Sequence, residues 1–230
     1  PLEQLADALA EDRPLAQRIS GIHFHNHFAS SDAMALQVTL LRLEAALGKR
    51  LGALNWINMG GGYRPRNPAE ATALGQVMRT FRERHGLTVW LEPGKAIVGP
   101  AGSLVSTVVD CFEREGQSIA VLDTGVQHLP EVFEYQQAPP LREHLPDGAY
   151  SCLLVGSTCL AGDVFGEYRL AAPPRVGDRL CFDDVGAYSL IKASRFNGYD
   201  LPTLYLREAG GALRRMKTFG YADYQRQWSA

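Results

Sequence analysis

Apolar positions in the first hundred residues alternate between short continuous runs and runs with helical spacing. Residues 20–28, 54–59 and 88–91 form short apolar runs that predict strands. Between them, residues 32–48 and 68–85 place apolar side chains three and four positions apart, which predicts two amphipathic helices. The order strand, helix, strand, helix, strand predicts a parallel sheet whose strands all end at the same edge.

The pattern changes near residue 100. The second part consists of short runs rich in β-branched residues and punctuated by Gly and Pro, so it is predicted to be mostly β. These runs are 104–109, 118–123, 150–155, 179–183 and 203–206. We therefore expect two domains, residues 1–100 and 101–230. A closed (β/α)₈ barrel needs about 250 residues, so three β/α units form either an open sheet or the later part of a barrel.

Composition and charge exclude some classes of function. The 230 residues (25.2 kDa) are 46% hydrophobic and 21% charged, as is typical of a globular protein. Lys and Arg total 23 and Asp and Glu 25, and the net charge of −2 argues against nucleic-acid binding through a basic surface. The absence of an apolar run of about 18 residues argues against a membrane span. Four cysteines without a CxxC pair, and no visible signal peptide, predict a reducing cytoplasm.

Candidate chemistry in the first part follows the predicted strands. His23, His25 and His27 alternate and would share one face of a strand, where three imidazoles either bind zinc or pack and hydrogen-bond. Gly60–Gly62 follow the next strand, where main-chain amides can approach a phosphate; an ordinary loop is the simpler interpretation. Glu92 ends the third strand. The carboxyl ends of parallel strands carry the chemistry of α/β folds, so these groups are expected at one edge.

Two loops of the second part have unusual composition. Gly156–Asp163 is a loop of small residues that contains Cys159, and Gly186–Ser189 contains Tyr188. Taken singly, such a thiol is most simply a buried apolar group and such a tyrosine a core aromatic. The order and spacing of the motifs as a set are far more specific.

As a set, these motifs resemble the fold-type III pyridoxal phosphate-dependent decarboxylases, which include ornithine, diaminopimelate and carboxynorspermidine decarboxylases. The resemblance runs from about Gly21 to Leu206 and is strongest to the carboxynorspermidine branch. It implies the C-terminal part of an alanine racemase-like (β/α)₈ barrel over residues 1–100. Residues 101–230 are then a mostly β domain that completes the active site and a homodimer. The segments that carry the resemblance are Gly21–Asn26, Leu91–Gly94, Asp123–Thr124 with His128–Glu131, Thr158–Asp163, and Lys192 with Phe196–Gly198.

The resemblance also implies roles for single residues around pyridoxal 5′-phosphate. His25 matches the histidine that stacks on the pyridine ring, and Glu92 the carboxylate that pairs with the ring nitrogen. Cys159 matches the acid that crosses from the partner subunit. The phosphate is then bound by Gly60, Gly61, Gly62, Gly94 and Tyr188. Candidates for binding the substrate are His128, Glu131 and Asp163. Glu134 is a further candidate for binding a distal amine, and for His128, Glu131 and Glu134 the simpler interpretation is that they are exposed loop residues.

Two substitutions and one absence separate this sequence from ornithine decarboxylase. Lys95 stands where an arginine is usual, and Leu160 replaces the acid after the cysteine, which makes a simple diamine-forming substrate doubtful. In this family the Schiff-base lysine lies on an early barrel strand, before the histidine-rich strand. None of the four lysines (Lys49, Lys95, Lys192 and Lys217) lies there. We therefore expect an N-terminal barrel fragment that carries this lysine, as a second chain or as a further segment, unless it was lost in a non-enzyme relative.

The resulting prediction is a decarboxylase acting on an amino acid that carries an amine or a 3-amino-3-carboxypropyl group. Carboxynorspermidine-like compounds are the first choice, and the same group on another scaffold, as in microcin C-type biosynthesis, is a second. Two alternatives stay open: an amino-acid racemase of the same fold, and a non-catalytic regulator resembling an antizyme inhibitor.

Overall fold

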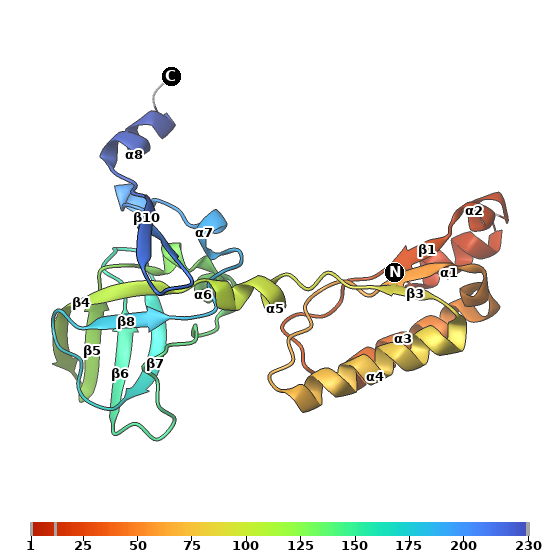
Figure 1. Ribbon diagram of the computed structural model, residues 1–230, viewed down its shortest axis with the longest axis horizontal. Coiled ribbons are helices and arrows are strands. Elements are labelled where there is room, and N and C mark those ends of the chain that lie inside the picture. Colours follow the sequence, from red (N-terminus) through yellow and green to blue (C-terminus); the bar gives the residue numbers. More distant parts are fainter. Residues whose placement is uncertain (1, 12, 229–230) are drawn as a thin grey trace. The chain divides into compact units, whose positions relative to one another are not determined.

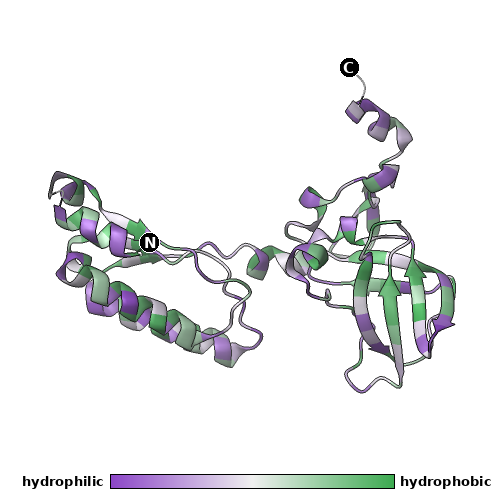
Figure 2. Cartoon of the chain, turned by 180° about the vertical axis from the view of Figure 1, so that it is seen from behind, coloured by the Kyte–Doolittle hydropathy of each residue, from purple (hydrophilic) through white to green (hydrophobic). Residues whose placement is uncertain are grey.

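The structure, a computed structural model, describes residues 2–11 and 13–228. It divides into two compact units, Pro1–Ile97 (unit 1) and Val98–Ala230 (unit 2), close to the position where the sequence pattern changes (Figure 1). Apolar residues, green in Figure 2, are frequent in the strands of unit 2 and alternate with polar residues along the long helices of unit 1. Each unit has its own hydrophobic core.

Unit 1 contains two β/α repeats and a third strand, in the predicted order. Its β-sheet has the order β1-β2-β3, and both pairs are parallel. Two N-terminal helices precede the sheet, and the short α5 follows it at the boundary between the units. The elements are α1 (Leu2–Glu11), α2 (Arg13–Arg18), β1 (Gly21–His23), α3 (Ala33–Leu47), a 3₁₀ turn (Gly48–Ala53), β2 (Trp56–Asn58), α4 (Pro68–His85), β3 (Thr88–Trp90) and α5 (Lys95–Val98).

Local signals fix the ends of the two long helices of unit 1. Asp32 caps α3, because its carboxylate accepts hydrogen bonds from the main-chain nitrogens of Met34 and Ala35. Asn67 caps α4 in the same way. Gly86 ends α4 at a φ of 67°, a left-handed conformation that favours glycine.

The register of the unit 1 sheet sorts its residues onto two faces. Ile22, Ile57 and Val89 form one row across the three strands and belong to the core with α3 and α4. The next row is His23, Asn58 and Trp90, and side chains of adjacent rows point to opposite faces. The second row therefore faces away from the helices.

One expectation about this sheet was wrong. β1 ends at His23, so His25 and His27 lie in the loop that follows and do not share a strand face with it. His25 is exposed, whereas His27 is buried against the ring of Tyr63, with ring centroids 4.8 Å apart. Among residues 2–11 and 13–228, no group of three or more His, Cys, Asp or Glu side chains could hold a metal ion.

Unit 2 is built around a five-stranded sheet of order β7-β6-β5-β4-β8, in which only the β5–β6 pair is parallel. Its core includes Phe165, Phe182 and Leu154, which are almost completely buried. The elements are a 3₁₀ turn (Gly99–Ala101), β4 (Leu104–Arg114), β5 (Gln117–Leu122), η3 (Val126–His128), α6 (Pro130–Tyr135), β6 (Tyr150–Val155), β7 (Val164–Leu170), β8 (Arg179–Phe182), α7 (Ser189–Lys192), η4 (Phe196–Gly198), β9 (Leu204–Arg207), β10 (Leu213–Lys217) and α8 (Tyr221–Trp228).

The C-terminal part of unit 2 is a separate two-stranded hairpin, β9 with β10, followed by α8. Within the described parts of the chain, every helix is too short or too polar to cross a membrane.

Candidate active site

The candidate residues of unit 1 lie where its three parallel strands end. His25 follows β1, Gly60–Gly62 follow β2, and Glu92 follows β3. Main-chain hydrogen bonds continue the sheet beyond the strands, from Phe24 N to Asn58 O (3.0 Å) and from Glu92 N to Gly60 O (2.9 Å). The sheet therefore brings these residues to one edge, as the strand order predicts.

Glu92 is the centre of a small polar network at this edge. Asn58 Nδ2 donates a hydrogen bond to Glu92 Oε1 at 2.7 Å, and His23 Nε2 lies 3.6 Å from the same oxygen. Asn58 Oδ1 also accepts a hydrogen bond from Gly60 N at 2.9 Å. The carboxylate remains about half exposed (48%) and can take a further partner. Sequence reasoning missed Asn58, although its place in the last position of a strand is a usable signal.

The triple glycine is required by close main-chain approaches. A Cβ on Gly61 would lie 2.4 Å from Glu92 O, and one on Gly62 would lie 2.0 Å from His27 O. The loop after β2 is thus pressed against the loops after β1 and β3. Gly94, in the turn after Glu92, is exposed, and its carbonyl accepts a hydrogen bond from Ile97 N at 3.0 Å.

In unit 2, Asp163 holds together the two loops that carry the other candidates. Its Oδ1 accepts a hydrogen bond from Val126 N at 2.8 Å, and its Oδ2 accepts from Thr158 N at 3.1 Å and from Thr158 Oγ1. A Cβ on Gly125 or Gly156 would lie 2.8 or 2.2 Å from the carboxylate, so both loops need glycine there. Asp163 is 6% exposed and is fully engaged within the chain, which favours a structural role over direct contact with substrate.

Cys159 is exposed and contacts a second loop. Asn197 Nδ2 donates to Cys159 Sγ at 2.9 Å, and the nearby hydroxyls of Ser157 and Tyr199 are 2.5 Å apart. Asn197 has a φ of 53°, and such left-handed conformations are tolerated best by Gly, Asn and Asp. The motif Phe196–Gly198 therefore contacts the thiol through Asn197, a contact that the sequence did not reveal.

His128 is buried in η3, whose first residue, Val126, donates a hydrogen bond to Asp163. Its Nδ1 lies 2.8 Å from Thr124 Oγ1, and its ring meets the edge of Tyr199 at a centroid distance of 5.8 Å. Burial lowers the pKa of His128 to about 4, and the nearby carboxylates of Asp163 and Asp123 only partly oppose this effect. The imidazole is therefore neutral near pH 7.

Tyr188 and Glu131 belong to two short helices that contact each other. Tyr188 is 52% exposed at the start of α7, and Glu131 is buried on α6, where it accepts a hydrogen bond from Ser189 Oγ at 2.7 Å. Lys192 of α7 forms an ion pair with Glu134 of α6 at 2.6 Å. His128 and Glu131 are buried in unit 2, contrary to the simpler interpretation of exposed loop residues, whereas Glu134 is exposed as that interpretation expects. Asp163 is buried as well.

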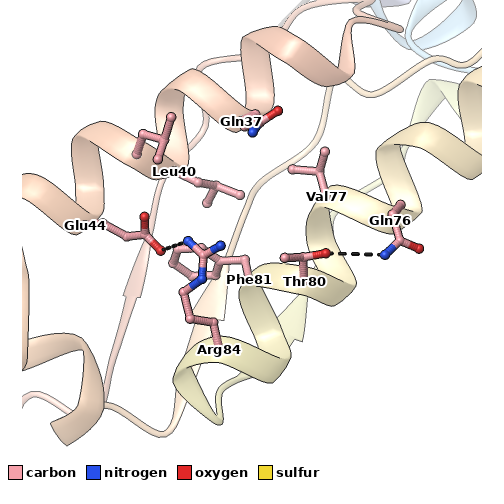
Figure 3. Close-up of a pocket in the computed structure, with 9 residues that line it drawn as sticks. Gln37, Leu40, Glu44, Gln76, Val77, Thr80, Phe81 and Arg84 are labelled. Atoms are coloured by element: carbon pink, nitrogen blue, oxygen red, sulfur yellow. Dashed lines mark hydrogen bonds and ion pairs between the residues drawn. The ribbon is translucent and has the colours of Figure 1, made fainter.

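A cavity of about 270 Å³ lies elsewhere in unit 1, between α3 and α4 (Figure 3). An ion pair from Arg84 to Glu44 crosses it at 2.8 Å. Leu40, Val77 and Phe81 line it, and none of the candidate site residues does.

Parallel strands in β/α units, followed by a mostly β unit, are the arrangement expected at the end of a (β/α)₈ barrel with an appended sheet domain. The family model described as "Pyridoxal-dependent decarboxylase, C-terminal sheet domain" matches residues 6–186. This chain therefore belongs to the pyridoxal-dependent decarboxylase family. The expected fold class is confirmed: the end of a (β/α)₈ barrel followed by a mostly β domain.

Individual relatives agree with this family. The chain is 36% identical over 221 residues to a carboxynorspermidine/carboxyspermidine decarboxylase from Campylobacter jejuni, covering 90% of this chain and 57% of the relative. It is 36% identical over 216 residues to a carboxyaminopropylagmatine decarboxylase from Synechocystis, covering 92% and 56%. Among solved structures, the Campylobacter jejuni carboxynorspermidine decarboxylase complexed with norspermidine matches with a TM-score of 0.77 and 33% identity, covering 91% and 60%. The chain thus spans a little over half the length of these relatives.

The cofactor of this family is pyridoxal phosphate, and the residues at the edge of the unit 1 sheet fit it. The network of Asn58 and His23 leaves the Glu92 carboxylate half exposed, which suits a protonated ring nitrogen. His25 is exposed at the same edge, with its ring next to Gly61, and the close-packed glycines after β2 leave no side chain between main chain and phosphate.

Proposed function

We propose that this chain is the C-terminal portion of a carboxy-lyase that decarboxylates an amino acid carrying a 3-amino-3-carboxypropyl group, as in carboxynorspermidine. The observation that carries the proposal is the half-exposed Glu92 carboxylate, oriented by Asn58 and His23 at the edge where the glycine loop lies. Similarity to relatives named for carboxynorspermidine and carboxyaminopropylagmatine favours this substrate class.

Pyridoxal phosphate, when bound, supplies the electron sink for the carbanion that remains after loss of CO₂. Glu92 pairs with the ring nitrogen, because its negative charge favours the protonated nitrogen. His25 stacks on the ring face. The phosphate is bound by main-chain N–H groups of Gly60–Gly62 and Gly94 and by the hydroxyl of Tyr188.

Cys159 returns a proton from its Sγ to the Cα that has lost CO₂. The hydrogen bond from Asn197 fixes the direction of the thiol. The hydrogen bonds that Asp163 accepts from Thr158 fix the loop that carries Cys159. Cys159 acts from the partner subunit of a homodimer, so each dimer has two shared sites.

Two residues of unit 2 support this substrate class. Leu160 leaves no acid directly after the thiol, so a short diamine-forming substrate lacks a partner there. Neutral His128 is compatible with a cationic amine, which a charged imidazolium would repel. We further propose a cytoplasmic location, where Cys159 stays reduced.

The test combines this chain with an N-terminal barrel fragment carrying the Schiff-base lysine and supplies carboxynorspermidine, diaminopimelate and ornithine separately. The expected result is CO₂ release and an aminopropyl product, fastest with carboxynorspermidine. Racemised substrate without CO₂ would identify a racemase instead. Absence of both cofactor binding and turnover would favour the regulator.

A further inference from the structure

Tyr188 has a backbone conformation that a tyrosine seldom adopts. Its φ is 66° and its ψ is −39°, and Ser189 N donates to Ala187 O at 2.8 Å across it. This is a γ-turn with positive φ, which is rare and strained for a residue with a Cβ. The Tyr188 side chain is 52% exposed, so packing of its own ring contributes little to holding the conformation.

Ser189, the residue after Tyr188, holds this turn in place. Ser189 is 3% exposed, and its Oγ donates to Glu131 Oε2 at 2.7 Å, while Glu131 is 9% exposed on α6. A hydrogen bond from a buried hydroxyl to a buried carboxylate is charge-assisted and is costly to break. It therefore fixes Ser189, and with it the turn centred on Tyr188.

A second contact joins the same two helices. Lys192, three residues after Ser189, forms an ion pair with Glu134, three residues after Glu131. Lys192 Nζ also lies over the Tyr188 ring, 5.3 Å from its centroid. The buried Glu131–Ser189 contact and the exposed Glu134–Lys192 contact together dock α7 on α6. The exposed ion pair contributes less, because water screens it.

We infer that Glu131 and Ser189 are positioning residues that hold Tyr188 in its strained turn so that its hydroxyl binds the cofactor phosphate. This inference rests on the proposed function, in which Tyr188 binds that phosphate. It gives Glu131 a role through Tyr188 in place of direct contact with substrate.

The test compares pyridoxal phosphate with pyridoxal, which lacks the phosphate, in the complete protein that includes the N-terminal barrel fragment. Dissociation constants are measured by quenching of tryptophan fluorescence for the wild type, Tyr188→Phe, Ser189→Ala and Ser189→Thr. We expect Ser189→Ala to weaken binding of pyridoxal phosphate about tenfold and to leave binding of pyridoxal unchanged. Ser189→Thr keeps the hydroxyl and should restore the affinity.

Ser151→Ala is the matched control, because Ser151 also donates to a glutamate, Glu167, in unit 2. It should change neither constant. A variant that misfolds would weaken both ligands equally, and that result for Ser189→Ala would overturn the inference. Unchanged binding of pyridoxal phosphate in Ser189→Ala, with weakened binding in Tyr188→Phe, would also overturn it. Unchanged binding of pyridoxal phosphate in Tyr188→Phe would contradict the proposed contact between the Tyr188 hydroxyl and the phosphate.

Discussion

The Asp163 carboxylate accepts a hydrogen bond from the main-chain nitrogen of Val126 at 2.8 Å, across 37 residues of sequence. Its other oxygen binds both the amide and the hydroxyl of Thr158. One buried carboxylate thus joins the loop of Cys159 to the turn of His128. Candidate groups that lie far apart in the sequence are placed by a residue that need not touch substrate.

Asp163→Asn should loosen both loops. The amide can replace only one of the two acceptor oxygens, so Val126 N–H or Thr158 N–H loses its partner at a cost of about 1–3 kcal/mol. We expect amide hydrogen exchange at that position to accelerate at least about tenfold, in line with this cost. Exposed Asp147→Asn is the control. Unaltered exchange at the amides of both Val126 and Thr158 would contradict the proposal that Asp163 holds the two loops together.

Glu92→Gln should leave cofactor binding partly intact and slow decarboxylation. The neutral amide keeps the size of the side chain but removes the negative charge that favours a protonated ring nitrogen. The loss is several kcal/mol at most, on the order of one to three powers of ten in rate. Single-turnover release of CO₂ measures it, with Glu83→Gln on the exposed face of α4 as control. An unchanged rate constant would count against the assignment of Glu92.

The sequence predicts the strands and helices of unit 1 well because their signals are local. The second helix was predicted over residues 68–85, and α4 spans Pro68–His85, because Asn67 and Gly86 cap it. The strand over 20–28 was predicted too long, because alternation of His23, His25 and His27 imitates strand periodicity after the strand has ended.

The candidate site was predictable only in part. Cys159 and Glu92 stand in recognisable motifs, but Asn58 and Asn197 act through contacts that span 34 and 38 residues. No periodicity in the sequence encodes such contacts. β7 was missed because Val164–Leu170 contains Gly, Glu and Arg, and its pairing with β6 determines its structure.

Buried His128 should make unit 2 less stable in acid. Its pKa is about 4 in the folded chain against an ordinary value of 6.5, so the unfolded state binds more protons between these values. Stability is therefore present above about pH 6.5 and is lost as the pH falls towards 4, by about 3 kcal/mol in all. Urea unfolding at pH 7.5 and 4.5 measures this loss. It should shrink in His128→Gln and persist in the exposed His144→Gln. An equal loss in all three proteins would contradict it.

Cys159 is predicted to act in trans. If each site combines Cys159 of one chain with the cofactor lysine of its partner, a dimer of two differently inactivated chains contains one intact site. We therefore expect mixtures of a Cys159→Ala protein and a protein lacking the cofactor lysine to regain roughly a quarter of wild-type activity, since half the dimers are hybrids with one intact site of two. Native mass spectrometry of the mixture verifies that hybrid dimers have formed. Verified hybrid dimers without activity would refute a shared site.

We predict that the unit 1 sheet needs further strands to be stable. β1 and β3 each pair only with β2 among the described residues, and the edge residues Trp90 and Leu91 are 58% and 41% exposed. Open parallel edges invite aggregation, and parallel sheets are normally covered on both faces.

We therefore predict that residues 1–230 alone will not form a stable yellow holoenzyme. An added N-terminal barrel fragment should restore solubility and the visible absorbance of bound pyridoxal phosphate. Size-exclusion chromatography, thermal unfolding and visible spectra of the chain with and without the fragment test this. A chain that unfolds cooperatively and binds the cofactor covalently by itself would refute it, and would require one of its own lysines, first of all Lys95 beside Gly94, to form the bond.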